Sequence, residues 1–198
     1  MVHSEQARSE PVAPLFPSIR NEAGTRWACA AFVSMLWKLL DMASPLRREW
    51  WLDAYLQVAQ QLETDSQYTP RGGRFLGYRG PAWKYVQEAV HWACEQNLPA
   101  LEARKAWCCG ACLLETIPSV LYILIRYAAD LEGALIRAAN QTQENDTTAI
   151  VGPAVGALHG ESAIPQRWIN RLSGRIAEHD DRRISQLIDR ARAAFWES

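Results

Sequence analysis

Two carboxylates and a hydroxyl lie within four consecutive positions, at Glu144, Asp146 and Thr147. Oxygen donors of this kind are the ligands that hard cations such as Mg²⁺ and Mn²⁺ prefer. Alternate residues of an extended turn point to the same side, so the two carboxylates can face one cavity. The same residue types also begin helices, because Asp and Thr accept hydrogen bonds from free N–H groups there. Spacing alone favours the helix start, since helix caps are far commoner than metal sites.

The surrounding segment, residues 140–168, resembles the ADP-ribosylglycohydrolase family. Members carry Asp-x-Asp-Thr at the start of a Gly/Ala-rich helix, followed by a Gly-Ala-x-x-Gly segment and an Ile/Leu-Pro-x-x-Trp signature. The corresponding segments here are ENDT from Glu144, GALHG from Gly156 and IPQRW from Ile164. Residues 113–122, LLETIPSVLY, are also similar to the helix that precedes this turn in the family.

This resemblance implies a metal-dependent hydrolase that removes ADP-ribose from modified protein side chains. In the family, the turn binds one or both of two divalent ions, Mg²⁺ or Mn²⁺, which hold the hydroxyls of the ribose. Carried over, Glu144, Asp146 and Thr147 are metal ligands, and the carboxylates of Glu144 and Asp146 are catalytic. The implied partners are ADP-ribosylated proteins or ADP-ribose. Candidate substrate contacts are Gly110, where relatives often have Gly-Gly-Tyr, and Tyr78 in a loop rich in glycine and arginine.

Charge counting predicts that this site is incomplete. Two divalent ions carry four positive charges, whereas the turn supplies two carboxylates and a neutral hydroxyl. The Thr-Asp-Asp and Gly-Asp-Ala segments that provide further acids in the family are absent from the 198 residues. Glu144 also replaces the usual Asp, and Pro153 lies within the expected helix. The resemblance therefore corresponds to the C-terminal part of a longer fold, which is truncated or split here, with a homodimer or a missing N-terminal half supplying the rest.

A second function remains open, in which the chain is a helical remnant without catalytic activity. Such a module would bind a partner protein, or ADP-ribose weakly, through the face that the missing half would cover. An apolar patch on that face would favour dimerisation.

Composition limits the classes of protein. An apolar content of 48% and a charged content of 22% are typical of a globular domain with a buried core. The net charge of −1 argues against nucleic acid as a partner. No apolar run, including residues 120–125, approaches the ~20 residues of a membrane span. Five cysteines, an odd number, suit a reducing compartment, so we expect a cytoplasmic protein.

Periodicity predicts an all-α fold, a compact orthogonal bundle of about eight or nine helices. Residues 1–18, with three prolines, are expected to form a flexible leader, and residues 19–198 a single domain. Residues 63–80 have no helical period and are expected to form a loop, whose arginines either clasp a diphosphate or, more commonly, face solvent. The helices are expected at about 25–42, 45–62, 81–96, 101–109, 117–128, 131–139, 146–160, 165–172 and 183–196.

Several other residues favour structural roles. Gly152, Gly156 and Gly160 lie four apart on one helical face, which favours close packing of another backbone over approach of a substrate. Most of the nine tryptophans are expected to pack in or against the core, with a stacking surface as the alternative. The cluster Cys108, Cys109 and Cys112 favours buried thiols over a zinc or redox site, because no second ligand pair follows. His91 and His159 favour packing or capping.

Overall fold

The computed structural model describes residues 22–42, 47–63, 66–107, 113–142, 145–172 and 183–195. It confirms the all-α prediction, because the only pairing of extended backbone among these residues is an isolated bridge between Tyr68 and Gly80. No described helix is both long and apolar enough to cross a bilayer. The helices are α1 (Glu22–Leu40), α2 (Trp50–Leu62), α3 (Ala82–Glu95), α4 (Ala100–Ala106), α5 (Leu113–Tyr127), α6 (Leu131–Gln141), α7 (Asn145–His159), α8 (Gln166–Leu172) and α9 (Arg183–Phe195), with a 3₁₀ turn η2 (Glu161–Ala163).

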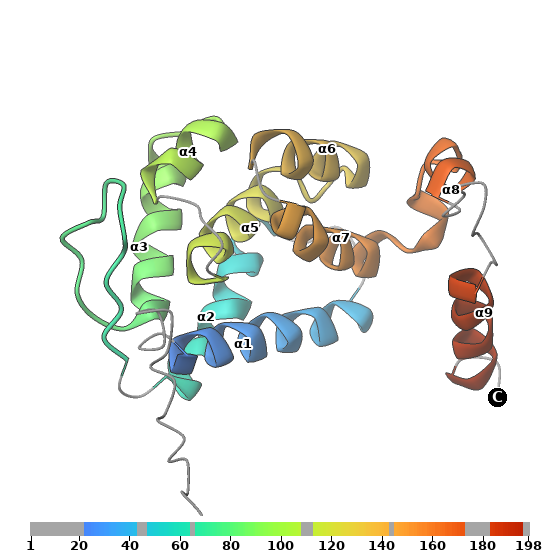
Figure 1. The fold of residues 1–198 in the computed structure, drawn as a ribbon, viewed down its shortest axis with the longest axis horizontal. Helices are drawn as coiled ribbons and strands as arrows, with labels where there is room; N and C mark the ends of the chain where they lie inside the picture. The colour runs from blue at the N-terminus through green and yellow to red at the C-terminus, as the bar shows by residue number, and fades with distance from the viewer. Residues whose placement is uncertain are drawn as a thin grey trace, which may run out of the picture.

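Helix α5 forms the centre of the bundle (Figure 1). It packs against α1, α2, α3, α4, α6 and α7. Every residue from Leu114 to Leu124 is buried, and most of them are apolar on all sides of the helix. Exposure of any face of such a helix would place apolar surface in water, which is unfavourable. The other helices therefore pack around α5.

Helix α7 lies between α1, α5 and α6, and it buries one side in the same core. Val151, Ala154 and Val155 are fully buried on this side. These positions follow the three-to-four residue spacing of one helical face. Packing against three helices fixes the orientation of α7 and hence the position of its first turn.

Helices α8 and α9 stand to one side of this bundle (Figure 1). An ion pair between Arg167 and Glu132 joins α8 to α6, and another between Arg192 and Glu161 joins α9 to η2. The apolar side chains of Leu187 and Ile188 on α9 are 59% and 57% exposed. The last helix therefore exposes apolar side chains to solvent.

The helix starts differ most from the sequence predictions at α2 and α5. Helix α2 begins at Trp50 rather than near residue 45, and the preceding described residues 47–49 form a turn. Helix α5 begins at Leu113, four residues earlier than expected, which places Pro118 inside the helix rather than near its start. Pro118 cannot donate a hydrogen bond to the previous turn, but burial of the helix on all sides outweighs that loss. Residues 1–18 and Cys108, Cys109 and Cys112 lie outside the described part of the chain.

Most of the described tryptophans pack in or against the core, as expected. Trp51 and Trp107 are in the core, and the Trp107 indole N–H donates a hydrogen bond to the Ser119 hydroxyl at 2.9 Å. Trp37 on α1 is instead 72% exposed. Four others are partly buried against the core: Trp50, Trp83, Trp92 and Trp168.

Candidate functional site

The candidate ligand residues Asp146 and Thr147 lie in the first turn of α7, as its second and third residues. This position agrees with a helix start. The carboxylate of Asp146 is exposed near the positive end of the helix dipole, whereas Thr147 is completely buried. Glu144 and Gly110 lie outside the described residues, so their predicted roles as ligand, catalyst and substrate contact stay predictions.

Three buried side-chain oxygens near this turn have no hydrogen-bond partner among the described residues. They are Oγ1 of Thr147, Oγ1 of Thr148 and Oε1 of Gln141 at the end of α6. A neighbouring hydroxyl shows the usual arrangement, since Thr142 donates to the carbonyl of Ala138 at 2.5 Å. Burial of an unsatisfied oxygen costs about 1–3 kcal/mol, so such atoms typically have a partner such as a water or an ion.

These atoms fit part of a metal site but not a whole one. Oxygen donors are suited to a hard cation. Asp146 would supply a carboxylate with one negative charge, and Thr147 would supply a neutral hydroxyl. Within the described ranges, however, no group of three or more His, Cys, Asp or Glu side chains could hold a metal ion. The described residues therefore supply at most a fraction of the ligands that a pair of divalent ions requires.

The glycine face of α7 is open, in contrast to the close packing expected from the sequence. A Cβ atom at Gly152 would meet only Leu135 Cδ2, at 3.7 Å, which is an ordinary contact. Among the described residues, no atom lies within 4 Å of a Cβ built at Gly156 or Gly160. Gly160 ends the helix with a φ of 76°, a conformation that favours glycine. The expectation of tight helix packing is therefore wrong at Gly156 and Gly160, whereas Gly152 lies in ordinary contact with α6.

The candidate substrate contact Tyr78 is held by the protein itself. Its hydroxyl donates to the Pro81 carbonyl at 2.7 Å, and its ring centroid is 5.6 Å from that of Tyr85. Burial, with the nearby carboxylates of Glu88 and Glu63, raises the pKa of Tyr78 to about 12. The hydroxyl is therefore neutral at ordinary pH, and a contact with substrate through it stays a prediction.

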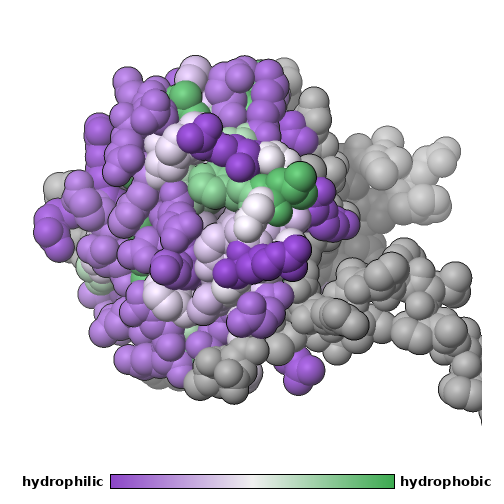
Figure 2. All heavy atoms as spheres, turned by 90° about the vertical axis from the view of Figure 1, so that its left-hand side faces the viewer, coloured by the Kyte–Doolittle hydropathy of each residue, from purple (hydrophilic) through white to green (hydrophobic). Residues whose placement is uncertain are grey.

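The loop around Tyr78 is tied to the bundle by two of its arginines. Arg71 donates from Nε and Nη2 to both oxygens of Glu115, at 2.7 and 2.6 Å, and the Glu115 side chain is 2% exposed. The guanidinium of Arg74 lies 4.6 Å from the ring centroid of Trp92. Figure 2 views the side of the molecule that carries this loop and shows a mainly hydrophilic face with one small hydrophobic patch. Arg71 and Arg74 therefore make structural contacts within the protein.

Two buried acids that the sequence did not single out organise this region. Besides Glu115, the carboxylate of Glu63 accepts hydrogen bonds from the backbone N–H groups of Ala82 at 2.5 Å and Trp83 at 2.8 Å. It thus caps α3, whose N-cap residue Pro81 has no side chain able to do so. The residues that contact Glu63 and Glu115 are far from them in the sequence, so no local pattern predicts these contacts. The only local signal was the presence of an acid, Glu115, within an apolar helix.

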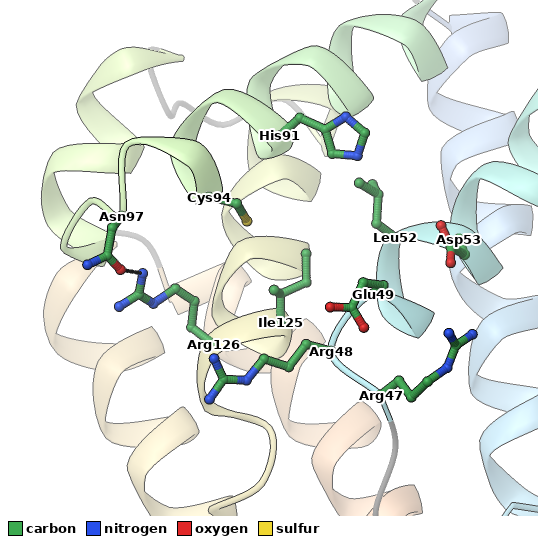
Figure 3. A pocket seen from close by; sticks show the side chains of 10 residues that line it. All are labelled: Arg47, Arg48, Glu49, Leu52, Asp53, His91, Cys94, Asn97, Ile125 and Arg126. Carbon is green, nitrogen blue, oxygen red and sulfur yellow. Dashed lines mark hydrogen bonds between the residues drawn. The ribbon is translucent and has the colours of Figure 1, made fainter.

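The two histidines have different surroundings. A ring nitrogen of His159 lies 2.6 Å from the Ala128 carbonyl, which ties the end of α7 to the residue after α5. This contact confirms a structural role. His91 is exposed and lines a cavity of about 570 Å³ between the start of α2, the end of α3 and the end of α5 (Figure 3). Three arginines, Arg47, Arg48 and Arg126, line the same cavity, and no residue of α7 does.

Comparison with known proteins gives one family. Neither the curated proteins nor the solved structures contain a match to the chain. The family model described as ADP-ribosylglycohydrolase matches residues 20–198, which is nearly the whole sequence and includes every described helix. The chain therefore belongs to the ADP-ribosylglycohydrolase family.

Proposed function

We propose that this chain forms the α7 side of a metal-dependent glycohydrolase site that removes ADP-ribose from modified protein side chains. Family membership supports the class of reaction. The observation that supports the metal is the buried Thr147 oxygen, which has no hydrogen-bond partner among the described residues; Thr147 directly follows Asp146, whose side chain is exposed.

Asp146, Thr147 and Glu144 would hold the ion, Mg²⁺ or Mn²⁺. When bound, such an ion orients ribose hydroxyls and helps water attack the anomeric carbon. The carboxylates of Asp146 and Glu144 would stabilise the positive charge that develops on the sugar as the side chain leaves. The open face at Gly156 leaves room for a sugar beside α7. Further acidic ligands have to come from residues beyond the described ranges or from a second chain.

Release of ADP-ribose from an ADP-ribosylated protein tests this proposal. We expect release with Mn²⁺, loss of release with a chelator, and loss in Asp146→Asn and Thr147→Val. Thr148→Val is the matched control, because it removes an equally unpartnered hydroxyl from the same turn and should leave release unchanged. Release without metal would contradict the proposal. So would absence of release together with absence of Mn²⁺-dependent ADP-ribose binding.

A non-catalytic interaction module is the second candidate, and an exposed apolar stripe on α1 favours it. Val33, Trp37 and Leu40 are 60%, 72% and 58% exposed and lie on one side of the helix. Helix α9 also exposes two apolar side chains, Leu187 and Ile188. An isolated helix of its 13 residues is only marginally stable in water. We propose that α9 of a second copy of this chain covers the α1 stripe.

Light scattering coupled to gel filtration tests this dimer. We expect a dimer that Trp37→Gln and Leu187→Gln each convert to monomer. Leu76→Gln is the control, because Leu76 is 59% exposed but lies in the 66–80 loop. A monomer at all concentrations, or equal dissociation by Leu76→Gln, would overturn the interface.

A further inference from the structure

The cavity between α2, α3 and α5 gathers positive charge away from α7. Its volume of about 570 Å³ is in the range of small-molecule sites, which is roughly 300–1,000 Å³. Arg47 and Arg48 precede α2, and Arg126 belongs to the last turn of α5. In Figure 3 the guanidinium groups of Arg48 and Arg126 lie on the same side of the cavity, with Arg47 opposite.

Arg126 is held in a fixed orientation. Its Nη1 donates to Asn97 Oδ1 and, at 3.3 Å, to the Tyr122 hydroxyl. Its guanidinium lies 5.7 Å from the ring centroid of Tyr122 and 5.8 Å from that of Tyr127. These contacts leave Nε and Nη2 as donors, and a guanidinium that is already ordered loses little entropy when it binds an anion.

The donors of Arg47 and Arg48 are also available. Both residues are exposed, and within the described ranges their side chains make no ion pair with Glu49 or Asp53, the two acids that line the cavity. Three guanidinium charges therefore face two carboxylates, which leaves an excess of positive charge. Like charges that share a cavity repel one another until an anion binds between them.

Apolar side chains complete the lining. Leu52 is buried, Ile125 is half-buried, and both line the cavity between the charged groups. An apolar surface beside charged donors suits an organic molecule with an anionic group better than a bare ion. The geometry of the donors favours a phosphate, because its tetrahedral oxygens accept hydrogen bonds from guanidinium groups in several directions, whereas a carboxylate accepts them in one plane.

We propose that this cavity binds the phosphate group of a small molecule through Arg48 and Arg126, with Arg47 adding charge from the opposite side. Glu49 points into the cavity in Figure 3 and opposes the anion. The site is separate from the metal site proposed at α7, because none of its lining residues belongs to that helix.

Isothermal titration with inorganic phosphate and with phenyl phosphate, at matched low ionic strength, tests the site. We expect Arg48→Gln and Arg126→Gln each to weaken binding about tenfold, which corresponds to loss of one charged hydrogen-bonding group. Glu49→Gln should tighten binding, because it removes the opposing charge. Tighter binding of phenyl phosphate than of phosphate identifies an organic ligand, and equal binding identifies the free anion; both support a phosphate site.

Controls separate this site from general attraction of anions and from the glycohydrolase proposal. Arg79→Gln removes an exposed arginine that lies outside the cavity and should leave both affinities unchanged. Asp146→Asn should also have no effect, so either proposal can fail without the other. Circular dichroism checks that the Arg126 variant is folded, and Arg48→Gln repeats the test at a residue outside the helices. No binding of either compound, or equal loss in Arg79→Gln, would overturn the inference.

Discussion

At the scale of single residues, an ion pair between exposed Arg71 and buried Glu115 holds the 66–80 loop against the bundle. Glu115 is nearly inaccessible and receives two hydrogen bonds from Arg71, whose own side chain is 59% exposed. We expect Arg71→Met to lower the free energy of unfolding by about 2 kcal/mol, because the buried carboxylate loses its partner. Urea denaturation measures the change. Arg79→Met, on the exposed part of the same loop, should change stability by less than about 0.5 kcal/mol, and equal effects would contradict the role of the pair.

Tyr78 makes stability depend on alkaline pH. Its pKa is raised to about 12 from the ordinary 10.0, mainly by burial, so the unfolded chain loses this proton first as pH rises. The contribution of Tyr78 is therefore fully present below pH 10 and is lost between about pH 10 and 12. Denaturation across this range should show a shallower fall in stability for Tyr78→Phe than for the natural chain. Parallel curves would show that Tyr78 does not keep its proton in the folded state.

The sequence indicated Asp146 and Thr147 correctly as the start of a helix, because the relevant contacts are local. It did not reveal that the Thr147 oxygen is buried with no hydrogen-bond partner in the described part of the chain, since burial depends on α1, α5 and α6 packing around α7. Glu63 and Arg71 were missed for a related reason. Their partners, Ala82 and Glu115, are 19 and 44 residues away, and helical periodicity does not predict contacts over such separations.

At the scale of elements, α7 contains a glycine, Gly156, that has room for a side chain. A Cβ at Gly156 would have no neighbour within 4 Å, so Gly156→Ala should stabilise the protein by about 0.5–1 kcal/mol through helix propensity. Gly133→Ala in α6 is the contrast, because its Cβ would lie 2.3 Å from Asp130 Oδ2 and force that side chain to move. Thermal unfolding measures both. A loss of stability in Gly156→Ala would show that another segment packs on this face.

Helix positions were predictable because apolar spacing is a local property, and α3, α8 and α9 begin and end within about a residue of expectation. The errors arose where tertiary packing overrides a local signal. Pro118 would end an exposed helix, yet it lies inside α5, where burial of every residue from Leu114 to Leu124 stabilises the helix around it. The helix expected from residue 45 is not present at residues 47–49, and α2 begins at Trp50.

At the scale of the whole molecule, the bundle around α5 presents separate surfaces with different chemistry. The first turn of α7 offers oxygen atoms, the cavity at the ends of α2, α3 and α5 offers guanidinium groups, and α1 offers an apolar stripe. Composition could not reveal any of these, because each combines residues from distant segments or depends on which helical face the core leaves exposed. Family membership indicates a glycohydrolase-type reaction, and the proposed function assigns that reaction to the first of these surfaces.

The central claim is that the start of α7 binds a divalent ion. Isothermal titration with Mn²⁺ tests it most directly, in the natural chain, in Asp146→Asn and Thr147→Val, and in Thr148→Val as control. We expect saturable binding in the natural chain and the control, with binding lost or at least tenfold weaker in the other two, because each loses a ligand oxygen. Absence of Mn²⁺ binding by the folded natural chain, or binding unchanged in Asp146→Asn and Thr147→Val, would contradict the account.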